Sequence, residues 1–75
     1  MQIEVISYAE EKRNRLSWEY GEAKADEVDE RMKPRWENLS IKLREHIAEG
    51  DLLGAKKTLN EYFRSMRKEI IKTFN

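Results

Sequence analysis

The sequence predicts an all-α protein, a small antiparallel three-helix bundle with a short extended N-terminus. Three observations predict this fold. Apolar residues recur at helical spacing in three runs, a strong helix stop separates the last two runs, and the 75 residues include only one Pro and three Gly. We expect one helical domain over residues 1–75, with helices at about 7–22, 26–49 and 51–74.

The first six residues alternate apolar and polar side chains through position 5, which predicts an extended lead-in or a short strand. A helix start follows, because Ser7 and Glu10 have the spacing of a capping box, in which each side chain bonds the other residue's backbone N–H. The first helix is therefore expected to begin at Ser7.

The apolar stripe of this first helix is the weakest of the three. Its members are Ala9, Leu16, Tyr20 and Ala23. Arg13 stands where a further apolar residue would continue the stripe. Gly21 weakens a helix interior by about 1 kcal/mol relative to Ala, so the helix is expected to end near Tyr20 or to run on to Lys24.

The second run follows helical spacing over two dozen residues. Its members are Val28, Met32, Trp36, Leu39, Leu43, His46 and Ile47. Asp26 is the expected N-cap. Pro34 lies inside the run, and we favour a kinked helix over a broken one because the stripe keeps its phase across the proline. The alternative is a break near Lys33 and a separate helix over 35–49.

Gly50 and Asp51 predict a turn, since glycine suits the left-handed position that ends a helix and aspartate caps the next helix. The third helix has the most regular apolar stripe. Its members are Leu52, Ala55, Leu59, Tyr62, Phe63, Met66, Ile70 and Phe74. The alternative fold is a long hairpin over 26–74 that dimerises into a four-helix bundle, with residues 1–20 as an arm.

The charges divide unevenly along the chain, although the formal net charge is zero. Residues 1–30 hold nine acids and four bases, a net of −5, and residues 31–75 hold six acids and eleven bases, a net of +5. The absence of Cys excludes a disulfide framework. No apolar stretch exceeds two residues, which excludes a membrane span and favours the cytoplasm.

Residues suited to catalysis or metal binding are sparse. His46 is the only histidine, and with Glu49 three residues on it falls short of the ligand count of a metal site. The four serines lack a glycine-rich nucleophile elbow, and no phosphate-binding glycine loop occurs. We therefore expect a non-enzymatic protein with no metal and no cofactor.

Apolar residues outside the stripes are the strongest indication of function. They are Trp18, Ile41 and Ile71. An exposed Trp is typical of an interface, and the alternative is that Trp18 covers a second face of the core or packs on Ile3 and Val5. We expect a small inhibitor, adaptor or regulator that docks a helical surface on a protein partner, by analogy with the small regulators that phages and mobile elements encode. A homodimer is a further expectation.

The alternative function is nucleic-acid binding. Four cations share the side of the last helix opposite its apolar stripe, where they can follow phosphates. They are Lys57, Arg64, Lys68 and Lys72. An acidic patch in the first half can instead imitate a phosphate backbone for a basic partner. Its residues are Glu22, Asp26, Asp29 and Glu30.

Overall fold

The computed structural model describes residues 3–74, which fold into four α-helices and contain no strand. The helices are α1 (Ile3–Tyr20), α2 (Glu22–Arg31), α3 (Lys33–Ala48) and α4 (Leu52–Phe74). The all-α class is confirmed, and the described residues form four helices where three were expected. Their principal extents are 40 × 21 × 15 Å.

The start of α1 differs from the prediction. Ile3 already lies in the helix, so the expected extended segment is wrong over residues 3–6, and residues 1–2 lie outside the described part. Ser7 lies inside α1, so the expected helix start there is also wrong. Contacts with α4 explain the extension, because Val5 is buried in the core and Tyr8 Oη donates to Asn60 Oδ1 at 2.7 Å.

Gly21 separates α1 from α2. Its φ of +96° lies in the region that favours glycine, and its N–H donates to the Ser17 carbonyl at 2.9 Å. The first helix therefore ends at Tyr20, the earlier of the two expected ends. Asp26 lies within α2 and is not an N-cap, so that prediction is wrong.

A break at Met32, not a kink, separates α2 from α3. Pro34 occupies the first turn of α3, where the N–H that proline lacks has no helical partner in any case. The favoured kink is therefore wrong, and the alternative of a break is confirmed. Met32 stays buried and Trp36 N still donates to its carbonyl at 3.0 Å, which explains why the apolar pattern keeps its phase.

The turn between α3 and α4 is confirmed as predicted. Gly50 has a φ of +75°, and Asp51 N donates to the His46 carbonyl at 2.8 Å, as in a Schellman motif. Asp51 Oδ1 accepts the Gly54 N–H at 2.9 Å and caps the start of α4. The backbone groups at this reversal are thereby satisfied.

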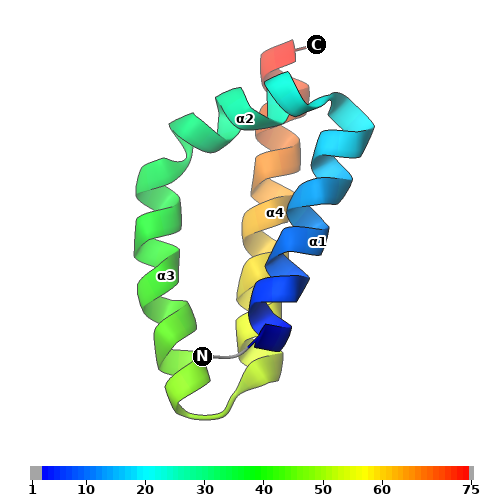
Figure 1. Cartoon of the computed structure of the whole chain (residues 1–75). Helices are drawn as coiled ribbons and strands as arrows, with labels where there is room; N and C mark the ends of the chain where they lie inside the picture. The colour runs from blue at the N-terminus through cyan, green and yellow to red at the C-terminus, as the bar shows by residue number, and fades with distance from the viewer. Residues whose placement is uncertain (1–2, 75) are drawn as a thin grey trace.

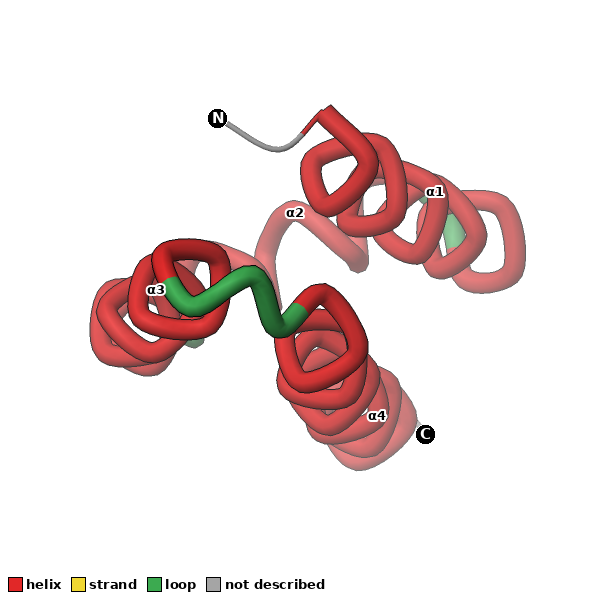
Figure 2. The backbone as a smooth tube through the Cα atoms, turned by 90° about the horizontal axis from the view of Figure 1, so that it is seen from below, coloured by secondary structure: helices red, strands yellow, loops and turns green. Residues whose placement is uncertain are grey.

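Helix α4 lies at the centre of the packing. Helices α1, α2 and α3 each pack against it, whereas the backbones of α1 and α3 do not approach one another. Figure 1 shows α1 and α3 standing apart with α2 passing between their ends, and the end-on view in Figure 2 shows the same separation. The fold is therefore open on the side opposite α4.

The core draws half of its members from α4. Its buried residues are Val5, Leu16, Ala25, Val28, Met32, Leu43, Ala55, Leu59, Tyr62, Phe63, Met66 and Ile70. Two ion pairs join the acidic first half of the chain to the basic second half, Lys56 Nζ to Glu4 Oε1 at 2.7 Å and Arg67 Nη2 to Glu19 Oε1 at 2.9 Å. Over residues 3–74, none of the helices has the length and apolar character that crossing a membrane requires.

Candidate functional site

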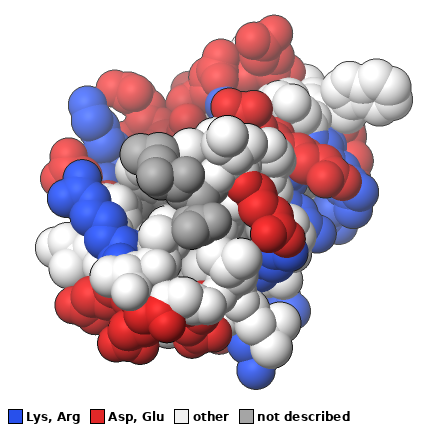
Figure 3. Space-filling view, turned by 60° about the horizontal axis from the view of Figure 1, so that its bottom comes forward, with Lys and Arg blue, Asp and Glu red and all other residues white. Residues whose placement is uncertain are grey.

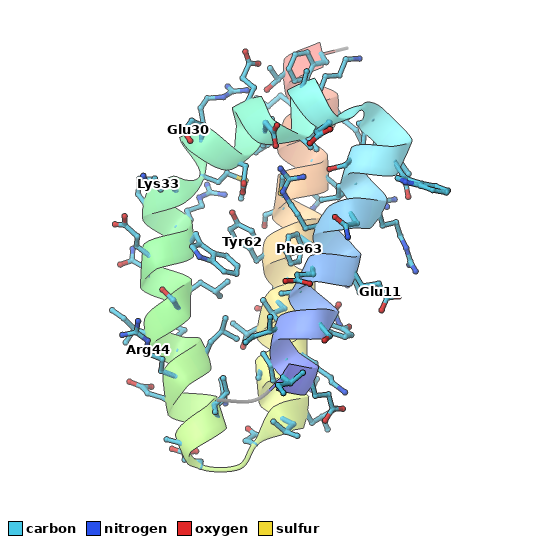
Figure 4. The ribbon with its side chains drawn as sticks, in the orientation of Figure 1. Glu11, Glu30, Lys33, Arg44, Tyr62 and Phe63 are labelled. Carbon is cyan, nitrogen blue, oxygen red and sulfur yellow. The ribbon has the colours of Figure 1, made fainter. Side chains whose placement is uncertain are left out.

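An open cavity of about 590 Å³ lies between α1 and α3, above α4 and against the end of α2. We call it the aromatic bowl. Its lining residues are Ala9, Glu10, Arg13, Asn14, Asp29, Glu30, Lys33, Trp36, Tyr62 and Phe63. In Figure 4, Tyr62 and Phe63 lie between α3 and α1, with Glu30 and Lys33 at the upper edge. The bowl exists because α1 and α3 both contact α4 but do not approach one another above Tyr62 and Phe63.

Three aromatic rings form the floor and one wall of the bowl. The Trp36 and Tyr62 ring centroids are 5.1 Å apart with an interplanar angle of 62°, and those of Tyr62 and Phe63 are 5.1 Å apart at 82°. These edge-to-face arrangements are favourable for aromatic pairs. Trp36 remains 36% exposed, so the row of rings runs from the buried floor up to the lip.

The Tyr62 hydroxyl is the unusual polar group of the bowl. Tyr62 is only 6% exposed, and among residues 3–74 its buried Oη finds no hydrogen-bond partner. Such an unpaired group costs about 1–3 kcal/mol. Burial, reinforced by the nearby Asp29 charge, raises the pKa of Tyr62 to about 12. The hydroxyl therefore stays protonated at neutral pH, and because its oxygen is buried, a ligand in the bowl meets the ring of Tyr62 and not its oxygen.

Arg13 on α1 lines the bowl and contacts two carboxylates of α2. Its Nη2 lies 2.5 Å from Asp26 Oδ1, its Nε lies 3.5 Å from Asp29 Oδ2, and its Nη1 donates to Ser17 Oγ at 2.6 Å. Arg13, which interrupts the apolar stripe of the first helix, is thus held by two carboxylates of α2. These contacts hold the Arg13 guanidinium in one position, so the side chain is a fixed part of the lining of the bowl.

The lip carries charges of both signs. Glu10, Glu30 and Lys33 are exposed, and within the described part of the chain none of them forms an ion pair. These groups are available to a ligand that presents complementary charges around an apolar centre.

The three predicted partner-binding residues lie on different helices. Trp18 projects from α1 and is 90% exposed, Ile41 lies on α3 and Ile71 on α4. The structure does not bring them together into one patch. Trp18 does lie close to the bowl, because Asn14 lines both the bowl and the shallow hollow beside Trp18.

The predicted basic row is exposed along α4, and among residues 3–74 its members form no ion pair. They are Lys57, Arg64, Lys68 and Lys72. Arg64 also lines a hollow of about 430 Å³ between α1 and α4 with three further cations that the sequence reading did not group. They are Lys12, Arg15 and Arg67.

The predicted acidic patch is divided by the fold. Asp26 and Asp29 bind Arg13, whereas Glu22 and Glu30 remain exposed on α2. On the face of the molecule shown in Figure 3, acidic and basic side chains are interspersed and neither sign dominates. Half of the patch is thus committed to holding α1 against α2.

His46 lies beside Asp51, with Nδ1 and Oδ2 3.1 Å apart, at the turn that begins α4. The Gly54 N–H, and then the neighbouring His46, lower the pKa of Asp51. No three His, Asp or Glu side chains within residues 3–74 gather in a way that would hold a metal ion. This pair therefore belongs to the helix cap.

The prediction that Tyr62 and Phe63 belong to apolar core stripes is confirmed, whereas Trp36 of the second stripe is partly exposed, and the cavity above these rings was not predicted. A usable signal was present, since two adjacent aromatics on one helix, Tyr62 and Phe63, form an apolar face wider than one neighbouring helix covers. Comparisons of the chain with protein-family models, with curated proteins and with solved structures found no match.

Proposed function

We propose that the chain is a non-enzymatic protein-interaction module that receives an aromatic side chain of its partner in the aromatic bowl. The observation that carries this proposal is the open cavity of about 590 Å³ lined by the rings of Trp36, Tyr62 and Phe63, with Trp36 still 36% exposed at its lip. An aromatic surface that stays open to water gains affinity when a ligand covers it.

The composition of the bowl supports a protein ligand. Trp, Tyr and Arg are the residues that dominate binding energy at protein interfaces, and all three line this cavity. A volume of about 590 Å³ accommodates one large side chain with its flanking backbone. The anchor that fits is Tyr or Trp, because each combines an aromatic body with one hydrogen-bonding group.

The proposed scaffold is an antiparallel bundle of the three long helices α1, α3 and α4, held open by α2. The break at Met32 supports this arrangement, since it lets α2 turn across the bundle end and set α3 away from α1. A rigid spacer of this kind keeps the bowl formed before a partner arrives, which reduces the entropy lost on binding.

The proposed function is tested with N-acetyl-tryptophanamide as the probe and the full chain labelled for NMR, at a concentration where the chain is monomeric. We expect saturable shifts of the Trp36, Tyr62 and Phe63 signals, with a dissociation constant on the order of 1 mM for so small a ligand. N-acetyl-alaninamide is the control and is expected to cause no saturable shift. A response equal for both probes, or none near the bowl, would reject the proposal.

A second candidate function is nucleic-acid binding, favoured by the cationic hollow between α1 and α4 that continues the basic row at Arg64. Phosphate contacts of this kind give salt-sensitive, sequence-independent affinity. We expect that replacing Lys57, Arg64 and Lys68 with Gln abolishes a gel shift of single-stranded or duplex DNA or RNA if this candidate is correct. Absence of a shift with the parent protein rejects it.

A further inference from the structure

Trp18 is the most exposed large apolar side chain of residues 3–74, at 90%, and it lies beside the aromatic bowl. We propose that the occupant of the bowl is Trp18 of a second copy of this chain, so that two copies exchange tryptophans in a two-fold symmetric dimer. This inference rests on the proposed function, since it assigns the aromatic anchor.

The spacing along α1 makes the exchange geometrically consistent. Glu10, Asn14 and Trp18 are four residues apart and therefore follow one ridge of the helix. When two α1 ridges pack in opposite directions about Asn14, Trp18 of each copy lies opposite Glu10 of the other. Each is about 6 Å along the axis from Asn14. Glu10 lines the lip of the bowl, so the indole meets its opening.

The hydrogen-bonding chemistry of the indole matches the bowl. The Nε1–H of Trp is a donor, and the exposed Glu10 carboxylate in the lining of the bowl is an acceptor that forms no ion pair within residues 3–74. The indole ring also adds an aromatic surface to the edge-to-face row of Trp36, Tyr62 and Phe63. One contact thus extends the aromatic row and covers the most exposed apolar side chain among residues 3–74.

The electrostatics permit the approach of two copies. The formal net charge is zero, so no overall repulsion opposes association. Arg15 and Glu11 flank the ridge as an exposed pair 3.6 Å apart within α1. In the opposed arrangement, Arg15 of one copy can pair with Glu11 of the other, which replaces a weak internal contact by one across the interface.

The arrangement is closed at two copies. Each chain presents one exposed Trp18 and one bowl on adjacent faces of α1, and the symmetric exchange uses both. An isologous contact of this type does not propagate, whereas a one-way insertion would continue from copy to copy. The expected species is therefore a dimer with no larger assembly.

Sedimentation velocity over a concentration series tests this inference. We expect a reversible monomer–dimer transition, and we expect Trp18→Ala to weaken it by at least about 100-fold because two anchors are lost per dimer. Leu53→Ala is the matched control, since Leu53 is another exposed apolar residue and lies at the far end of the fold. A parent protein that stays monomeric, species beyond the dimer, or an equal effect of both variants would overturn the inference.

Fluorine NMR on protein containing 5-fluorotryptophan tests the contact itself, because the chain has two tryptophans. We expect the Trp18 and Trp36 signals to shift with concentration at the same midpoint, and the Trp36 signal of Trp18→Ala to be independent of concentration. A concentration-dependent Trp36 signal in that variant would contradict the exchange. If the tryptophanamide probe binds the bowl while the chain stays monomeric, the exchange fails and the proposed function stands; if neither occurs, both fail.

Discussion

The Arg13 guanidinium on α1 lies 2.5 Å from the Asp26 carboxylate on α2. This contact joins two of the helices that line the aromatic bowl. The Arg13 side chain is only 22% exposed, so its alkyl stem contributes apolar contact while its charged end reaches the carboxylates. A residue that interrupts an apolar stripe thus serves as a connection between elements.

Arg13→Met preserves most of the stem and removes the charge. We expect the free energy of unfolding to fall by about 1 kcal/mol, the upper end for an ion pair whose carboxylates are largely exposed to solvent. Urea denaturation measures the change. The matched control is Arg44→Met, at an exposed position on α3, which is expected to change stability by less than about 0.5 kcal/mol. Equal losses in the two variants would contradict a bracing role for Arg13.

Pro34→Ala distinguishes a helix start from a strained helix interior. Because Pro34 occupies the first turn of α3, we expect a loss of about 0.4–1 kcal/mol, as the unfolded chain gains conformational freedom. Thermal and urea unfolding measure it. A gain approaching about 3 kcal/mol would instead indicate that α2 and α3 form one helix which proline distorts.

The helices that were predicted most accurately are those whose signals are local. The Gly50–Asp51 turn and the stripe of α4 depend on residues within one or two turns of one another, and both appear in the structure as expected. The start of α1 depends on distant partners instead. Val5 is buried by other elements and Tyr8 bonds Asn60, 52 residues away, so the local capping signal at Ser7 was overridden.

The bowl was not predictable because its existence depends on a separation between helices. Tyr62 and Trp36 have the spacing of core residues, and in a bundle whose helices all touch they would be fully covered. The separation follows from the break at Met32 and from the ten-residue length of α2. The sequence did contain the break as an alternative, but the phase of the apolar stripe favoured the kink.

The effect of replacing Gly54 on stability is expected to depend on whether Asp51 caps the start of α4. A Cβ at Gly54 would lie 2.8 Å from Asp51 Cγ and from His46 Nδ1, so Gly54→Ala must displace both the capping carboxylate and the His46 ring that contacts it. We expect no gain in stability from Gly54→Ala in the parent. In the Asp51→Ala background we expect a gain of up to about 1 kcal/mol from helix propensity. Thermal unfolding of the four proteins measures the coupling, and an identical effect in both backgrounds would contradict it.

The buried Tyr62 hydroxyl is expected to make the free energy of unfolding fall at alkaline pH. Its pKa is raised from 10.0 to about 12, chiefly by burial, so the folded state holds the phenolic proton more tightly than the unfolded chain does. A raised pKa contributes stability that is complete below about pH 10 and is lost as the pH rises towards 12. Tyr62→Phe removes this dependence, and Tyr8 and Tyr20 remain in both proteins.

The measurement compares urea unfolding of the parent and Tyr62→Phe at pH values from about 8 to 11.5, across the ordinary tyrosine range. We expect the stability difference between the two proteins to move in favour of the variant as the pH rises, because only the parent loses the Tyr62 contribution. Alkaline absorbance titration of both proteins assigns the group, since the difference between them belongs to Tyr62. A difference curve centred near pH 10 would show that the hydroxyl is hydrated and would contradict its burial in the core.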